Sequence, residues 1–338
     1  PRPPPPGGGG EGKIEGGPPA PRRGAFALQE VNVMARYLVK RVLQMIPVLL
    51  IITLVVFLLV NVAGDPTVNM LPLDATEADR QALREALGLN RPLYVQYLDF
   101  LGDAVTGNFG ESYRYNQPAV ELALQRIPAS VQLAGTALLL AIVLAIPLGI
   151  LSAMFANSPL DLAVSGISVL GRAMPNFWVG ILLILLFAVE LNVLPVSGSG
   201  TPAHLVLPAV TLAIQAASQI IPLIRSNMLA IMHEDYIRTA RSKGLREAGV
   251  VCIHAFKNAL VPVVTVVALE IPSLIGGSLI TETVFAWPGL GQFLIQAINN
   301  QDMSVVQVCI FLIAVITLVA NLLADIVYCL IDPRIRYS

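Results

Sequence analysis

The chain has 338 residues, of which 55% are hydrophobic and only 13% are charged, with 21 lysines and arginines against 22 aspartates and glutamates. Soluble domains carry about 25% charged residues, so this composition, with its long uncharged runs, excludes a typical cytosolic enzyme, a secreted disulfide scaffold and a disordered chain. It predicts an all-α integral membrane protein, and the net charge of −1 does not indicate a nucleic-acid partner.

The first 33 residues differ from the rest of the chain. They are dense in proline and glycine and nearly free of large apolar side chains, so they have little to bury and we expect disorder there. Met34 then begins a short basic flank that leads into an apolar run. We therefore expect that residues 1–33 are not native, that Met34 is the biological start, and that residues 34–338 form one domain.

Six stretches are long and apolar enough to cross a membrane, which takes about 20 residues. We expect them at residues 42–64, 127–156, between 161 and 191, 204–224, 259–280 and 305–330. The third stretch is interrupted by Arg172 and Pro175, and Arg172 is expected near the inner membrane boundary. The sequence therefore predicts a bundle of six transmembrane helices.

Basic residues in short loops indicate which side of the membrane a loop occupies. They precede the first span, lie between the fourth and fifth, and follow the sixth: Arg36, Lys40 and Arg41; Arg225, Arg238, Arg241, Lys243, Arg246 and Lys257; Arg334 and Arg336. With six spans these regions share one side. We expect that side, with both termini, to be cytoplasmic.

The connection 65–126 falls on the opposite side and has more acidic than basic residues. The stretch 76–88 has acidic residues first and basic residues later, as in an exposed helix, and it ends at Gly88. An apolar stripe at helical spacing follows: Leu93, Tyr94, Tyr97, Leu98 and Leu101. We expect this extracytoplasmic segment to form a small cap on the outer membrane face.

The loop 225–258 between the fourth and fifth spans carries the most specific pattern. Asp235 is suited to cap a helix over 236–243, and Gly244 is suited to the left-handed position that ends a helix. A second amphipathic helix then leads into the fifth span. DNA readout is disfavoured because two spans hold the loop at the membrane. Binding to a lipid surface and docking of a partner protein both remain open on these grounds.

Several motifs of the chain resemble one family of membrane transporters. Ala240-x-x-x-Gly244, followed by Asn-Ala-Leu-Val-Pro at 258–262, resembles the cytoplasmic coupling-loop motif of bacterial ABC-importer permeases. The stretch 235–245 resembles the form found in the dipeptide/oligopeptide/nickel permease family, and the stretches 107–130, 282–292 and 332–338 are similar to further segments of that family. The general motif opens Glu-Ala-Ala, whereas Arg238-Thr239-Ala240 stands here, which suits the peptide subfamily.

The resemblance implies that the loop holds a coupling helix seated in a cleft of a separate ATP-hydrolysing subunit. Small residues at Ala240 and Gly244 would then allow close approach, and the basic side chains would pair with acidic groups of the partner. The residues expected to couple are Asp235, Tyr236, Arg238, Thr239, Ala240, Arg241, Lys243 and Gly244.

The resemblance also implies the rest of the assembly. The partners would be a second homologous permease, two ABC ATPase subunits, an extracytoplasmic substrate-binding protein that docks on the segment 65–126, and membrane lipid. The chain would be a multi-pass protein of the bacterial inner membrane that is not itself an enzyme and binds no cofactor directly, with ATP on the partner subunits. The expected cargo is a dipeptide or short oligopeptide, and nickel chelates or glutathione remain open.

Ionisable and amide side chains inside spans are functional candidates because their burial in hydrocarbon is costly. Glu270, Asn321 and Asp325 are expected either to line a translocation path or to make polar contacts within the bundle. Near the outer end, Glu282, Trp287, Pro288 and Gly289 are candidates for an outer gate, with Trp287 held at the lipid headgroups.

Other functions have weaker support. His233-Glu234 begins like the zinc-protease motif H-E-x-x-H, but Ile237 stands where the second histidine is required. The cysteines and histidines are scattered, so no metal site is expected. The sequence has no phosphate-binding loop of the G-x-x-x-x-G-K-[ST] type, so any ATP must be bound elsewhere. A secondary transporter or channel remains the main alternative.

Overall fold

The computed structural model describes residues 23–63, 71, 75–86 and 88–331, and every regular element in these ranges is helical. In chain order these are α1 (Arg23–Ala63), α3 (Glu77–Ala86), α4 (Leu93–Thr106), α5 (Ala119–Leu124), α6 (Ile127–Met154), α7 (Pro159–Ala173), α8 (Asn176–Leu183), η1 (Ile184–Glu190), α9 (Pro202–Met232), α10 (Asp235–Ser242), α11 (Glu247–Gly249), η2 (Val250–Ala255), α12 (Phe256–Val284), α13 (Leu290–Asn299) and α14 (Met303–Ile331). The two η elements are π-helical turns. The expected all-α fold is confirmed.

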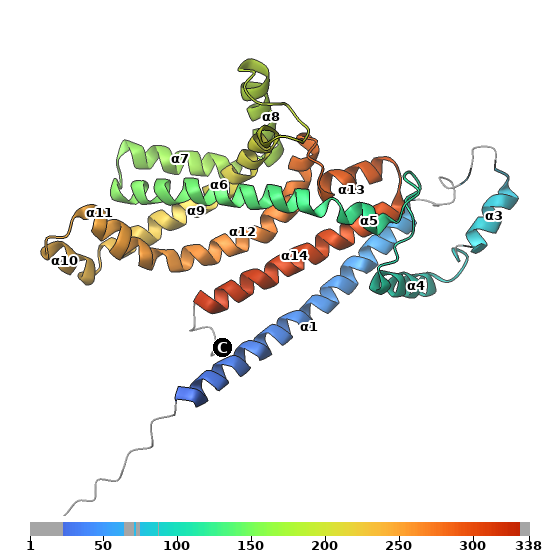
Figure 1. The fold of residues 1–338 in the computed structure, drawn as a ribbon, viewed down its shortest axis with the longest axis horizontal. Coiled ribbons are helices and arrows are strands. Elements are labelled where there is room, and N and C mark those ends of the chain that lie inside the picture. Colours follow the sequence, from blue (N-terminus) through green and yellow to red (C-terminus); the bar gives the residue numbers. More distant parts are fainter. Residues whose placement is uncertain (1–22, 64–70, 72–74, 87, 332–338) are drawn as a thin grey trace, which may run out of the picture.

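The helices α6, α7, α9 and α12 form the packed part of the bundle (Figure 1). Small residues allow α6 and α9 to approach closely: Ala137, Ala141 and Ala145 of α6 are fully buried. A Cβ atom added at Gly149 would lie 2.7 Å from the Cβ of Ile224 in α9. Contacts through small residues are the usual way in which helices pack in a membrane, where apolar side chains gain little from leaving lipid.

Among the described residues, five helical stretches are long and apolar enough to span a membrane: Leu38–Val60, Ala119–Met154, Pro202–Met232, Pro262–Val284 and Met303–Val327. They correspond to five of the six predicted spans.

The third predicted span is two helices and not one. The stretches Pro159–Ala173 and Asn176–Glu190 are bent by 111° against each other, and they make a sixth span only if the bent pair counts as one. The break follows from Pro175, because a proline forces the preceding residue out of the helical region. Met174 accordingly has φ −83° and ψ 135°.

Arg172 lies far along α7 from the end of the bundle that carries α10. Helix α7 starts at Pro159, at the end of the bundle where α10 lies (Figure 1). Arg172 is next to the last residue of this 15-residue helix, and it therefore lies about 20 Å from the start of α7.

The bundle has two different ends (Figure 1). The start of α1 and the end of α14 point toward the end that carries α10 and α11, and α1 packs alongside α14. The helices α3, α4, α5 and α13 lie at the other end. Two of the three basic regions, at the start of α1 and in the loop that carries α10, therefore lie toward the same end. Arg334 and Arg336 lie outside the described residues.

Helix α1 begins earlier than expected. It starts at Arg23, so residues 23–33 are helical and not disordered as predicted. The dense Pro/Gly run ends at Gly24, and the following stretch contains alanine, leucine, glutamine and glutamate, which favour helix. The remaining part of the predicted disordered stretch, residues 1–22, lies outside the described residues.

The segment between the first two spans contains the predicted helix 76–88 as α3. The backbone N–H of Asp79 donates to the hydroxyl of Thr76, and the backbone N–H of Thr76 donates to the carboxylate of Asp79, so the two residues cap the helix reciprocally. The helix ends at Ala86, and Gly88, where the end was predicted, has the left-handed φ of +70°. Residues 64–70, 72–74 and 87 of this region lie outside the described residues.

The same segment is attached to the spans at two points. The Tyr97 hydroxyl of α4 donates to the Leu50 carbonyl of α1 at 3.0 Å. The Ser112 hydroxyl donates to the carboxylate of Asp302, just before α14, and both residues are buried. The segment is therefore fixed to α1 and α14.

Candidate functional site

The loop between α9 and α12 folds into a compact helical elbow, residues 234–258, at one end of the bundle (Figure 1). Helix α10 begins at Asp235, and Glu234 occupies the cap position with φ −69° and ψ 148°. The expectation that Asp235 is the cap is therefore wrong by one residue. Lys243 ends the helix, and Gly244 has φ +77°, which confirms the predicted left-handed position.

The inner face of α10 packs against its own chain. Ile237 is fully buried and Ala240 is 8% exposed, and both belong to the core that contains Val250 and Val251 of η2. Residues three apart lie on the same helix face, so both turn inward together. Ala240 thus lets α10 pack closely against its own chain.

The outer face of α10 carries polar and basic side chains. Arg238, Thr239 and Lys243 are exposed. Arg238 lies 3.5 Å from the carboxylate of Asp235, a pair in which both side chains are mostly exposed and which contributes little to stability. These side chains remain accessible to another molecule.

The two arms of the elbow are joined across Gly244. The guanidinium of Arg241 donates two hydrogen bonds to the carboxylate of Glu247, at 2.7 and 3.1 Å. This bidentate pairing raises the pKa of Arg241 and lowers the pKa of Glu247. Arg241 is among the residues expected to face a partner and Glu247 is not, although opposite charges on both sides of a predicted turn are a readable signal.

A second contact fixes α10 to the start of α12. The side-chain amide of Asn258 donates to the Tyr236 hydroxyl at 2.9 Å and to the carbonyl of His254 at 3.1 Å. Because α10 is also continuous with α9 through residues 233 and 234, the elbow is held by two spans. Helix α10 is therefore joined to both α9 and α12.

Glu282 is fully buried at the end of α12, where it stabilises α13. Its carboxylate accepts hydrogen bonds from the backbone N–H groups of Gly291 and Gln292, at 2.7 and 3.3 Å, and from the hydroxyl of Ser278 at 3.1 Å. A carboxylate is stabilising at the N-terminus of a helix, where backbone donors lack partners. In this structure Glu282 thus caps the N-terminus of α13.

The neighbouring predicted gate residues are also packed inside the chain. Trp287 is 5% exposed, and its indole N–H donates to the carbonyl of Ala129 at 2.8 Å. The expectation that Trp287 lies at the headgroups is therefore wrong. Pro288 and Gly289 complete the turn before α13, and a Cβ at Gly289 would lie 2.4 Å from the Glu282 carboxyl carbon.

The three polar residues predicted inside spans do not form one site. Asp325 of α14 pairs with Arg41 of α1 at 3.2 Å. Asn321, one turn earlier, is exposed and lines a cavity of about 490 Å³ with Arg41 and Asp325. Glu270 of α12 is 7% exposed and does not line this cavity.

Comparison with known proteins identifies the chain's relatives. Residues 145–337 match the family described as binding-protein-dependent transport system inner membrane component, and residues 34–134 match the N-terminal part of such membrane components. The oligopeptide transport system permease protein AppB of Bacillus subtilis is 41% identical over 316 residues, covering 90% of this chain and all of the relative. The dipeptide transport system permease protein DppB of Escherichia coli K12 is 35% identical over 338 residues, with the same coverage.

A solved structure shares the fold. The MetNI methionine ABC transporter in an inward-facing conformation aligns with a TM-score of 0.52 at 20% identity, over 62% of this chain and 96% of that chain. Together with the apolar spans and the full-length relatives, the matched family makes this chain a membrane-embedded transport component. The chain belongs to the family of inner membrane components of binding-protein-dependent transport systems.

Proposed function

We propose that this chain is a permease subunit of an ATP-driven importer that moves dipeptides or short oligopeptides into the cytoplasm. Relatives whose names specify oligopeptide and dipeptide transport are 35–41% identical over 90% of the chain. The observation that carries the proposal is the elbow: an exposed polar and basic helix, α10, held by two spans at one end of the bundle.

In this proposal α10 is the coupling helix. An ATPase subunit receives its outer face, with Arg238, Lys243 and Thr239 accessible, while Ile237 and Ala240 connect it to the bundle core. The movement that accompanies ATP binding reaches α9 and α12 through the elbow as a rigid-body shift. The hydrogen bond to Tyr236 and the Arg241–Glu247 pair keep the elbow rigid, so that the shift is not absorbed by deformation of the elbow itself.

The assembly we propose contains this chain, a second homologous permease, two ATPase subunits that bind the ATP, and an extracytoplasmic binding protein. The α10 end of the bundle faces the cytoplasm, with both termini, because the basic regions gather there. The segment with α3, α4 and α5 then faces outward, where it serves as the docking surface for the binding protein.

Reconstitution tests this function. Proteoliposomes that contain all the subunits should accumulate a labelled dipeptide when ATP and the binding protein are supplied, and liposomes that lack this chain should not. Accumulation by this chain alone under a proton gradient would instead identify a secondary transporter and contradict the proposal.

A further inference from the structure

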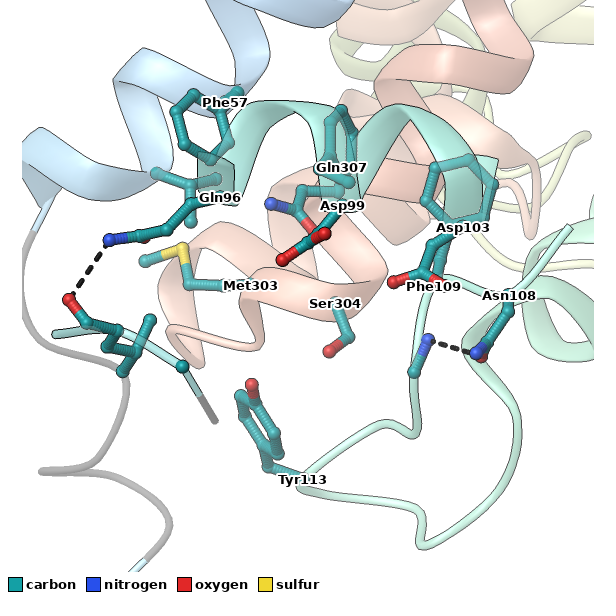
Figure 2. A pocket seen from close by; sticks show the side chains of 15 residues that line it. Phe57, Gln96, Asp99, Asp103, Asn108, Phe109, Tyr113, Met303, Ser304 and Gln307 are labelled. Atoms are coloured by element: carbon teal, nitrogen blue, oxygen red, sulfur yellow. Dashed lines mark hydrogen bonds between the residues drawn. The ribbon is translucent and has the colours of Figure 1, made fainter. Parts of the chain in front are cut away.

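A cavity of about 310 Å³ lies where α4 meets the end of α1 and the start of α14, at the end of the bundle away from α10. Its walls come from these three helices, from residues 88–89 and from the turn over residues 108–113, so it brings together parts of the chain that are far apart in the sequence. None of the candidate site residues described above lines it. Figure 2 shows its lining side chains.

The cavity has an excess of negative charge. Asp99 and Asp103 lie one turn apart on α4, and both carboxylates face the cavity in Figure 2. Asp99 pairs at the rim with Arg91, at 3.2 Å. Within the described residues, the carboxylate of Asp103 has neither an ion-pair nor a hydrogen-bond partner, so its charge is available to a cation.

Ser304 at the start of α14 supplies a second, independent observation. It is 8% exposed, and its side chain is directed into the cavity in Figure 2. Its hydroxyl has no hydrogen-bond partner among the described residues. The oxygen is open to the cavity and not enclosed by the chain, so it is available to hydrogen-bond a polar group placed there. The hydroxyl of Tyr113 approaches the same space from the opposite wall.

Aromatic rings form the remaining wall. The ring of Phe100 lies 6.0 Å from that of Phe57 and 6.1 Å from that of Phe109, measured between centroids. Phe57 and Phe109 are nearly fully buried. Such a wall suits an apolar group, and ring faces also attract cations. It does not suit a bare Ca²⁺ or Mg²⁺ ion, which needs six or more oxygen ligands around it.

We infer that this cavity binds a primary ammonium group attached to an apolar body, as at the amino terminus of a short peptide. The Asp103 carboxylate pairs with the positive charge of the ammonium group, and the Ser304 hydroxyl accepts a hydrogen bond from one of its three N–H groups. The phenylalanine wall contacts the side chain of the first residue of the peptide. The assignment to a peptide rests on the proposed function. The headgroup of an ethanolamine lipid also has a primary ammonium group. The test therefore measures binding of a peptide and of a lipid headgroup separately.

The test uses the full-length chain in phosphatidylcholine nanodiscs and titrates it with Ala-Phe or N-acetyl-Ala-Phe by calorimetry. Ala-Phe should bind, and acetylation, which removes the charge, should weaken binding by about tenfold or more. Asp103→Asn should cause a similar loss for Ala-Phe but leave the acetylated peptide unaffected, and Ser304→Ala should weaken Ala-Phe binding by several-fold. Glu121→Gln is the matched control, because Glu121 is exposed on α5 outside the cavity.

A lipid arm repeats the titration with phosphoethanolamine and phosphocholine. Binding of phosphoethanolamine together with Ala-Phe, both sensitive to Asp103→Asn, supports a general ammonium site. Binding of phosphoethanolamine without Ala-Phe overturns the peptide assignment. Equal binding of free and acetylated Ala-Phe, or no effect of Asp103→Asn in a variant with unchanged thermal unfolding, overturns the ammonium site itself.

ATP-dependent uptake of Ala-Phe by the assembled wild-type transporter is measured in parallel. Uptake that persists unchanged in Asp103→Asn overturns the inference and leaves the proposed function standing. Calorimetric binding with no ATP-dependent uptake by the wild type removes the proposed function and leaves the ammonium site supported.

Discussion

The carboxylate of Asp161 accepts two hydrogen bonds from the guanidinium of Arg225, at 2.6 and 2.7 Å, and so connects α7 to α9. Asp161 is 3% exposed, and it also accepts from the hydroxyl of Ser152 in α6. Three helices therefore meet at one buried charge, close to the end of the bundle that carries α10. In the sequence Arg225 is one of several loop cations, and nothing there indicates that Asp161 is its partner.

Replacing Asp161 by asparagine should destabilise the bundle, because Arg225 would then lose its anionic partner while remaining partly buried. Loss of one member of such a pair costs about 3 kcal/mol. The measurement is the free energy of unfolding of the detergent-solubilised protein. Asp235→Asn is the control, because the Asp235 side chain is 96% exposed. Equal stability of both variants would show that the pair does not hold α7 to α9.

The spans were predictable because their signal is local. A run of uncharged residues reads as a membrane helix from composition alone, and Gly244 was predictable as a left-handed residue because it follows a helical pattern directly. The bend at Pro175 had an equally local cause. The direction of α8 has no local cause, because it depends on packing such as that of Gly180 against Phe285, 105 positions along the chain.

The roles of side chains were less predictable where their partners are distant in sequence. Trp287 has an amphipathic ring that suits a headgroup region, but its N–H finds the carbonyl of Ala129, 158 positions away. Ala240 belongs to a motif with small residues, and only the folded elbow shows that η2 covers it. In each case the residue type was informative about close packing, but the sequence did not indicate which surface it packs against.

Glu282 should be required for the stability of α13. Glu282→Ala removes an acceptor from two backbone N–H groups and leaves them buried, at a cost of about 2–3 kcal/mol, whereas Glu282→Gln keeps an oxygen and should cost less. The thermal unfolding midpoint should be highest for the wild type, lower for Glu282→Gln and lowest for Glu282→Ala. If Gln and Ala unfold together at the wild-type temperature, the carboxylate does not cap α13.

The elbow should be sensitive to acid. The Arg241 guanidinium lowers the pKa of Glu247 below its ordinary value of 4.5, so the pair stabilises the folded elbow above that value and is lost as the pH falls through the lowered pKa. A carbon-13 NMR titration of the Glu247 carboxyl should show a midpoint below 4.5. In Arg241→Ala the midpoint should return to the ordinary value, and an unchanged midpoint would show that Arg241 is not the cause.

Gly244 gives the sharpest test of coupling, because its left-handed backbone and its exposure have separate consequences. With φ +77°, any residue with a Cβ is strained there, by about 1–2 kcal/mol, and asparagine is the side chain that tolerates this region best. No other atoms lie within 4 Å of a Cβ built at Gly244, so a large side chain would project outward from the elbow and not disturb the chain's own core. In the assembled importer, Gly244→Asn should keep most ATP-driven dipeptide uptake, and Gly244→Trp should reduce it by about tenfold or more while the chain remains folded. Normal uptake and normal stimulated ATP hydrolysis in Gly244→Trp would show that no partner approaches the elbow at this residue.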